Sequence, residues 1–317
     1  FRFINQDIDN TRAVIVSWGL NNPATYFTYD MSADKLSVLN YPYSTLPKSK
    51  LATGIKAKYY TRDKVLINSY ILVPPQYDGV TAMPLIVMPH GGPQSRDMVT
   101  YDDYAQFIAT KGYLVIKPNF RGSTGYGKEF EEAGYKEWGG KMQEDLEDAV
   151  KFLSDEGIAD KKRVCIIGAS YGGYAALMGL IKTPELYQCA ISLSGVSNLP
   201  EQVEYDLDKF ESEKLRDYVK NSIGDPDEDR TMLSSRSPAL HAKEITKPVL
   251  LIHGEDDEIV PHEQSEWMFE ALDEQDKWVR LITLEKTGHN ALYYREDIEK
   301  VYEQTEKFLA EFLPTNK

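Results

Sequence analysis

Hydrophobic and polar residues alternate in short runs over the first 46 residues, and this pattern predicts three β-strands. Turn-forming residues separate the runs at residues 21–23 and again at residues 30–34. Short alternating runs at a spacing of about ten residues are typical of antiparallel strands joined in chain order. The predicted strands cover residues 12–18, 26–30 and 35–39. Three strands offer too little apolar surface to be stable alone, so we expect this β-meander to belong to a larger unit.

From about residue 55 onward, continuous apolar runs replace the alternation, and a helical pattern follows many of them. Strands buried on both faces have this character, and their alternation with helices is typical of a parallel sheet covered on both sides. The pattern over residues 68–73 predicts an antiparallel strand that opens the sheet, and the later strands are predicted at residues 84–89, 113–117, 163–167, 189–193, 248–252 and 278–284. The clearest helices are predicted at residues 141–153, 172–182, 263–275 and 296–313. The predicted fold class is therefore α/β.

Composition and charge exclude several classes of protein and partner. The 317 residues include 36 Lys and Arg against 50 Asp and Glu, which gives a net charge of −14. Nucleic acids and anionic membranes bind basic surfaces, so neither is an expected partner. No apolar stretch is long enough to span a bilayer. Cys165 and Cys189 each lie in an apolar run, where we expect buried thiols and no disulfide framework.

The segment Gly168-Ala-Ser-Tyr-Gly172 is the strongest indication of chemistry in the chain. It matches the pattern G-x-S-x-G and lies between a predicted strand and a predicted helix, the arrangement that places a nucleophilic serine on a sharp turn in α/β-hydrolases. Ser170 is therefore the predicted nucleophile. The alternative is a chance match of a short pattern, which the flanking strand and helix make less common.

A serine nucleophile needs a base, and the base needs an acid that orients it. In α/β-hydrolases the order along the chain is serine, acid and histidine, each in a loop after a strand. Asp257 follows the strand at 248–252, with Asp256 as its rival, and His289 follows the strand at 278–284. The alternatives are a solvated acidic loop and a surface histidine.

Glycines after the strand at 84–89 indicate an oxyanion site. In Met88-Pro-His-Gly-Gly-Pro93, they allow the backbone to approach a substrate and to present an N–H group. We expect the N–H groups of Gly92 and Tyr171 to form the oxyanion hole. His90 is interpreted as a residue that orients this loop and not as a second base.

Three other patterns are rejected, and no metal or organic cofactor is predicted. Residues 225–229 open like a calcium loop, but Arg230 and Arg236 occupy the positions of the required glycine and glutamate. Residues 122–127 are rich in glycine yet lack the Gly-Lys-Ser/Thr of a phosphate-binding loop. The spacing of His253 and His262 fits no common metal site.

The motifs taken together resemble those of the prolyl oligopeptidase family of serine peptidases, and most closely its acylaminoacyl-peptidase-like branch. The resemblance covers about residues 50 to 313 and rests on residues 88–93, 119–127, 168–173, 235–238 and 253–261. It implies an α/β-hydrolase fold over residues 47–317. It also implies that residues 1–46 are a fragment of the last blade of a β-propeller, the domain that limits access to short peptides in this family.

The resemblance implies a role for individual residues. It implies Ser170 as nucleophile, His289 as general base and then acid, and Asp257 as the residue that orients it, with Gly92 and Tyr171 as oxyanion donors. Arg236 lies in a segment similar to one near the substrate pocket of the family, although a surface or loop-bracing role is equally open. The propeller residues that bind a substrate amino terminus in dipeptidyl-peptidase relatives have no counterpart here, so exopeptidase specificity does not transfer.

We therefore expect a serine peptidase that hydrolyses short peptides or acyl-aminoacyl substrates through an acyl-enzyme intermediate. One alternative is a carboxylesterase with the same triad, and an alternative of another class is an inactive hydrolase-like binding module. A cytoplasmic location is expected. Because the first residue is Phe1, we expect the chain to have been cut from a longer one, and a targeting signal could have been lost with the part upstream.

Overall fold

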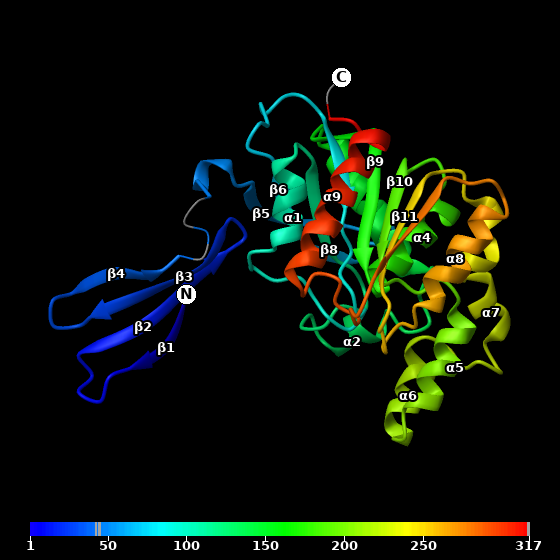
Figure 1. Cartoon of the computed structure of the whole chain (residues 1–317), viewed down its shortest axis with the longest axis horizontal. Coiled ribbons are helices and arrows are strands. Elements are labelled where there is room, and N and C mark those ends of the chain that lie inside the picture. The colour runs from blue at the N-terminus through cyan, green and yellow to red at the C-terminus, as the bar shows by residue number, and fades with distance from the viewer. Residues whose placement is uncertain (42, 44–45, 316–317) are drawn as a thin grey trace.

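The computed structural model describes residues 1–41, 43 and 46–315. The strands within them form two separate β-sheets (Figure 1). The predicted division of the chain at residue 46 adjoins residues 42 and 44–45, which lie outside the described part. The first sheet is antiparallel and has four strands in chain order, β1 (Arg2–Gln6), β2 (Arg12–Gly19), β3 (Asn22–Asp30) and β4 (Lys35–Asn40). The three strands predicted from the alternation are confirmed. The sequence pattern does not predict β1, because all five of its residues are exposed and it has no buried face.

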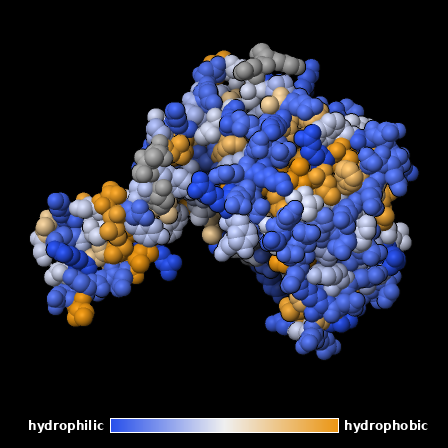
Figure 2. Space-filling model, viewed as in Figure 1, coloured by the Kyte–Doolittle hydropathy of each residue, from blue (hydrophilic) through white to orange (hydrophobic). Residues whose placement is uncertain are grey.

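Both edge strands of the first sheet carry exposed apolar side chains. Figure 2 shows apolar surface on this sheet, and the residues that contribute to it on β1 and β4 are Phe3, Ile4, Leu36, Val38 and Leu39. A sheet that faces water normally protects its edges with charge or with covering structure. The exposure is therefore consistent with a sheet that packs against further structure, and the interpretation as a propeller-blade fragment stays a prediction.

The second sheet has eight strands and confirms the predicted α/β class. Its spatial order is β12-β11-β10-β9-β7-β8-β6-β5. The strands β5 and β6 are antiparallel to their neighbours, and the others run parallel to one another. The strand bounds are Thr53–Tyr60 (β5), Leu66–Val73 (β6), Met83–Val87 (β7), Leu114–Asn119 (β8), Ala159–Ala169 (β9), Cys189–Leu193 (β10), Val249–Gly254 (β11) and Val279–Leu284 (β12).

Helices cover both faces of this sheet, as Figure 1 shows. Successive residues of a strand point to opposite faces, so Val87 and Ile166 pack with α3, α4 and α8, while Ile86 and Ile167 pack with α1 and α9. The helix bounds are Asp103–Thr110 (α1), Lys128–Glu132 (α2), Lys141–Asp155 (α3), Tyr171–Lys182 (α4), Leu199–Lys209 (α5), Glu213–Ser222 (α6), Arg230–Ser235 (α7), Glu263–Asp273 (α8) and Arg295–Phe312 (α9), with short 3₁₀ helices at Lys48–Lys50 and Pro238–Glu244. In the described part of the chain, no helix has the length and apolar character that crossing a bilayer requires.

The sequence pattern does not predict the strand β5 or the shorter helices α1, α2, α5, α6 and α7. The last three helices lie between β10 and β11, and α5 and α6 project away from the sheet (Figure 1). Among the residues of α6, only Val219 and Ser222 are buried. A helix that buries so little apolar surface leaves a weak periodic signal in the sequence.

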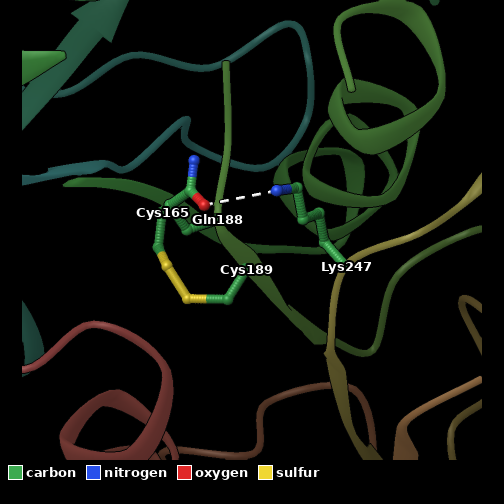
Figure 3. The surroundings of a disulfide bond; sticks show 4 residues. All are labelled: Cys165, Gln188, Cys189 and Lys247. Carbon is green, nitrogen blue, oxygen red and sulfur yellow. Dashed lines mark hydrogen bonds between the residues drawn. A yellow bond between two sulfur atoms is a disulfide. The ribbon is translucent and has the colours of Figure 1, made fainter. Parts of the chain in front are cut away.

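The two cysteines form a disulfide, which corrects the expectation of two buried thiols. Cys165 on β9 and Cys189 on β10 lie directly opposite each other in the parallel register, and the bond joins them (Figure 3). Both residues are fully buried. The expectation was wrong because 24 residues separate the cysteines and only the register of the two strands brings them together.

A buried ion pair ties the end of the sheet to α3. Arg121 follows β8 and is 3% exposed, and the carboxylate of Asp145 on α3 is fully buried. The backbone N–H of Arg121 donates to Asp145 Oδ2 at 2.8 Å, and its guanidinium donates to both oxygens of the same carboxylate. Asp63 accepts two further bonds from the guanidinium. Removing Arg121 would therefore leave a buried carboxylate without its counter-charge.

We predict that Arg121→Ala lowers the free energy of unfolding by about 3–5 kcal/mol, the usual cost of breaking a buried ion pair. Arg295→Ala is the matched control, because Arg295 pairs with Glu299 on the surface of α9 with its side chain 91% exposed. The control should change the free energy by less than about 1 kcal/mol. Urea denaturation measures both values, and equal losses in the two variants would contradict the assignment.

We also predict that the denatured, non-reduced chain takes up no alkylating reagent, since both cysteines are in the disulfide. After reduction in denaturant, two reagent molecules should add, one each at Cys165 and Cys189. Intact-mass measurement before and after reduction distinguishes the states. Two additions without reductant would show that the thiols are free.

Candidate active site

Ser170 lies on a sharp turn between strand β9 and helix α4. The strand β9 ends at Ala169 and α4 begins at Tyr171, so a single residue makes the turn. Ser170 has φ +58° and ψ −122°, a strained backbone conformation for a residue with a side chain. Its N–H donates to the carbonyl of Leu193 on the neighbouring strand β10 at 2.9 Å. These features are those of the turn that the sequence predicts.

The glycines on either side of Ser170 are required by close backbone contacts. A Cβ atom on Gly168 would lie 2.4 Å from the carbonyl carbon of Gly172. A Cβ atom on Gly172 would lie 2.3 Å from the carbonyl oxygen of Pro89. The two glycines of the pattern G-x-S-x-G therefore allow the sharp turn, and they leave room for the loop after β7 to lie beside Ser170.

The glycine-rich loop after β7 lies alongside Ser170. A Cβ atom on Gly91 would lie 3.3 Å from the Cβ of Ser170 and 3.1 Å from the carbonyl oxygen of Ala169. Gly92 follows with φ +119°, a conformation that favours glycine. Tyr171 is the first residue of α4, so its N–H has no acceptor within the helix and lies at the positive end of the helix dipole. The two expected oxyanion donors thus come from segments that meet at Ser170.

His90 is held as part of this loop. Its Nδ1 donates to the carbonyl of Gly91 at 2.8 Å, and its Nε2 lies 2.9 Å from the hydroxyl of Ser123. The ring stacks on Phe120 with the centroids 4.4 Å apart. Burial lowers the pKa of His90, which favours the neutral imidazole. These contacts fit the predicted loop-orienting role.

The carboxylate of Asp257 is fully buried and lies beside His289. The chain is rich in acidic residues, so a solvated acidic loop was the alternative for this segment. Asp257 lies in the loop after β11, and its Oδ2 accepts from His289 Nδ1 at 2.7 Å. Its Oδ1 accepts from the backbone N–H groups of Ile259 at 2.8 Å and Val260 at 3.0 Å. The structure therefore places Asp257, and not the exposed Asp256, against the histidine.

Two opposing effects act on the pKa of Asp257. Burial alone would raise it, but the hydrogen bonds from His253 and His289 lower it well below the ordinary value for a carboxyl group. Asp257 is therefore an anion under physiological conditions. An anion at this position accepts from His289 Nδ1 and so orients the imidazole.

A cavity of about 200 Å³ lies beside the loop after β7 and the end of β9. Its lining includes Gly91, Ala169 and Leu292, but Ser170, Asp257 and His289 are not among the residues that line it. No hydrogen bond connects Ser170 to His289 within the described residues. Such bonds are often long before substrate binds, and the pair of Asp257 and His289 is already formed.

An aromatic cluster around Tyr171, the residue after Ser170, has no counterpart in the sequence-based expectations. The ring of Tyr171 lies 4.6 Å from Trp138, 5.2 Å from Phe120 and 5.8 Å from Tyr174, as measured between centroids. These residues come from three separate segments. Because their proximity depends on the packing of those segments, no single stretch of sequence carries a signal for the cluster.

Arg236, the candidate pocket residue, braces the segment that carries Trp138. Its Nη1 donates to the carbonyls of Lys136 at 2.7 Å and Trp138 at 3.1 Å. Its own carbonyl accepts from the hydroxyl of Tyr174 at 2.9 Å. These are the contacts of the loop-bracing alternative, and contact with a substrate stays a prediction.

His253, which the sequence presents only as a rejected metal ligand, contacts the same acid. It is fully buried, and its Nε2 lies 3.1 Å from Asp257 Oδ2. The one signal in the sequence for this contact is the position of His253, four residues before Asp257 and at the end of a buried strand.

Across the described residues, no group of three or more His, Cys, Asp or Glu side chains is arranged to hold a metal ion.

Comparison with known proteins identifies the family. The model of the prolyl oligopeptidase family matches residues 99–315. The dipeptidyl aminopeptidase BIII of Pseudoxanthomonas mexicana is 34% identical over 96% of this chain and 45% of its own length, and the acylamino-acid-releasing enzyme of Rattus norvegicus is 29% identical over 69% of this chain and 30% of its own length. A puromycin-hydrolyzing peptidase of Mycobacterium tuberculosis superposes with a TM-score of 0.84 at 27% identity, over 97% of this chain and 46% of that one.

The chain spans less than half the length of these relatives. The family model nevertheless covers more than half of this chain, and it includes the turn at Ser170 and the loops of Asp257 and His289. The α/β-hydrolase fold inferred from the resemblance is confirmed by these structural neighbours. The chain therefore belongs to the prolyl oligopeptidase family.

Proposed function

We propose that this chain is a serine peptidase that hydrolyses short peptides or acyl-aminoacyl substrates, with Ser170, His289 and Asp257 as its catalytic triad. The observation that supports this most directly is the buried Asp257 carboxylate bound to His289 Nδ1 at 2.7 Å, next to a strained serine turn. The names of the relatives support short substrates. They include a dipeptidyl aminopeptidase, an acylamino-acid-releasing enzyme and a puromycin-hydrolyzing peptidase.

The proposed reaction has two steps. Because Nδ1 of His289 faces Asp257, Nε2 is the atom left to take the proton from Ser170 as its hydroxyl oxygen attacks the substrate carbonyl. The N–H groups of Gly92 and Tyr171 would hold the oxyanion, and His289 would return the proton to the departing amine. A water molecule, activated by His289, would then release the acyl group from Ser170.

Two finer assignments belong to the same proposal. We infer that residues 47–317 form the catalytic domain and that residues 1–46 belong to a separate β domain, because the two sheets share no strand. Arg236 would support the substrate pocket through the segment that carries Trp138.

Ser170→Ala should reduce kcat for an acyl-aminoacyl anilide by at least about 10³-fold, because the remaining oxyanion and binding contacts support only residual catalysis. Ser37→Ala is the matched control, since Ser37 is an exposed serine on β4 of the other sheet. It should retain the wild-type rate. Hydrolysis of the anilide by Ser170→Ala within a few-fold of wild type would refute the proposal.

A panel of amides and esters tests the carboxylesterase alternative. Esters are easier substrates than amides for any such triad, so ester hydrolysis alone does not separate a peptidase from an esterase. The informative quantity is the preference for an ester that carries an aminoacyl group over one that does not. We expect kcat/KM for an acyl-aminoacyl ester to exceed that for a simple acyl ester of equal size by at least about tenfold, since specific contacts favour the matched group. Measurable anilide hydrolysis should accompany it. Equal values for the two esters with no anilide hydrolysis would support the esterase.

A further inference from the structure

Two histidines share one oxygen of the proposed triad acid. Asp257 Oδ2 accepts from His289 Nδ1 at 2.7 Å and lies 3.1 Å from His253 Nε2. The reaction described above uses only the first of these. The second histidine is fully buried and has no access to substrate from the protein surface.

The partners of His253 determine which of its nitrogens carries a proton. Nε2 lies 2.9 Å from the carbonyl oxygen of Val260, and a carbonyl can only accept, so Nε2 is protonated. That proton is shared between the carbonyl and Asp257 Oδ2. On the other side of the ring, Nδ1 lies 2.7 Å from the hydroxyl of Ser265, which can donate to it. Both ring nitrogens therefore have a hydrogen-bonding partner.

His253 also connects the three elements around the acid. It lies on β11 opposite Thr283 of β12, it contacts the carbonyl of Val260 in the acid loop, and it contacts Ser265 on α8. The titratable groups that face it are Asp257 and the ring of His262, whose centroid lies 5.4 Å away. His262 in turn pairs with Glu266 at 3.3 Å.

We propose that His253 is a positioning residue for catalysis: its Nε2–H holds the Asp257 carboxylate in the rotamer that binds His289, and it draws part of the negative charge away from His289. This proposal rests on the triad proposed above. Two backbone donors hold Oδ1, whereas Oδ2 has only imidazole donors among the described residues, so removing His253 would leave His289 as the one donor to Oδ2.

The proposal predicts a change in kcat and in pH dependence when the donor is removed. His253→Leu should lower kcat by about 10- to 100-fold, by analogy with losing the hydrogen-bond partner behind a metal-ligating side chain, while KM changes by less than about threefold. The acid limb of the profile of kcat/KM against pH should move to higher pH, because the full negative charge of Asp257 then acts on the proposed base. His253→Gln keeps an N–H donor near the position of Nε2 and should recover most of both properties.

Two further variants keep the test decisive if His253→Leu does not fold. Ser265→Ala leaves the imidazole in place but removes its Nδ1 partner, so it should move the acid limb in the same direction by a smaller amount. His241→Gln is the matched control, because His241 contacts Glu244 and Ser234 and lies outside the triad contacts. It should retain the wild-type kcat and the wild-type profile.

The outcomes separate this proposal from the proposed function. If the wild-type chain hydrolyses anilides and the His253 and Ser265 variants keep its kcat and acid limb, the positioning role is wrong and the triad stands. Equal losses in His253→Leu and His253→Gln with an unmoved acid limb would also refute it, since a purely structural role moves only stability. If the wild-type chain itself has no activity, the proposed function fails first.

Discussion

The strained backbone of Ser170 is the constraint on which the rest of the site depends. A positive φ at this residue sends the chain from strand β9 directly into helix α4. It leaves the first N–H groups of that helix beside Ser170. The strain persists because the surroundings permit no alternative: Gly168 and Gly172 are in backbone contact, and the loop after β7 lies against them.

The order of the strands then brings the other groups to the same place. The carboxyl ends of β7, β9, β11 and β12 lie at one edge of the sheet, so the loops of Gly92, Ser170, Asp257 and His289 start from there. The sheet itself is rigid because both faces are buried under helices. The acid is fixed by four donors, and two of them come from the backbone of its own loop. The strands of a rigid sheet thus position the four loops that carry the proposed site residues.

Local signals in the sequence are sufficient to predict the fold class and to select the residues proposed for the site. The continuous apolar runs predict seven of the eight strands of the large sheet, and the pattern around Ser170 carries its own structural context. What escapes prediction depends on pairing between distant segments. The disulfide requires the register of β9 and β10, and the aromatic cluster requires three segments to meet at Tyr171. The sequence shows that His253 lies close to Asp257 along the chain, but their contact depends on how the loop after β11 turns.

Covalent labelling tests the central claim most directly. A fluorophosphonate reacts with a serine only when a base activates it, so both the site and the rate of labelling are informative. The account predicts a single adduct, mapped by peptide mass spectrometry to Ser170. It further predicts that His289→Ala slows the labelling by at least about 100-fold, because the base is then absent. An adduct on another residue, or an unchanged rate in His289→Ala, would contradict it.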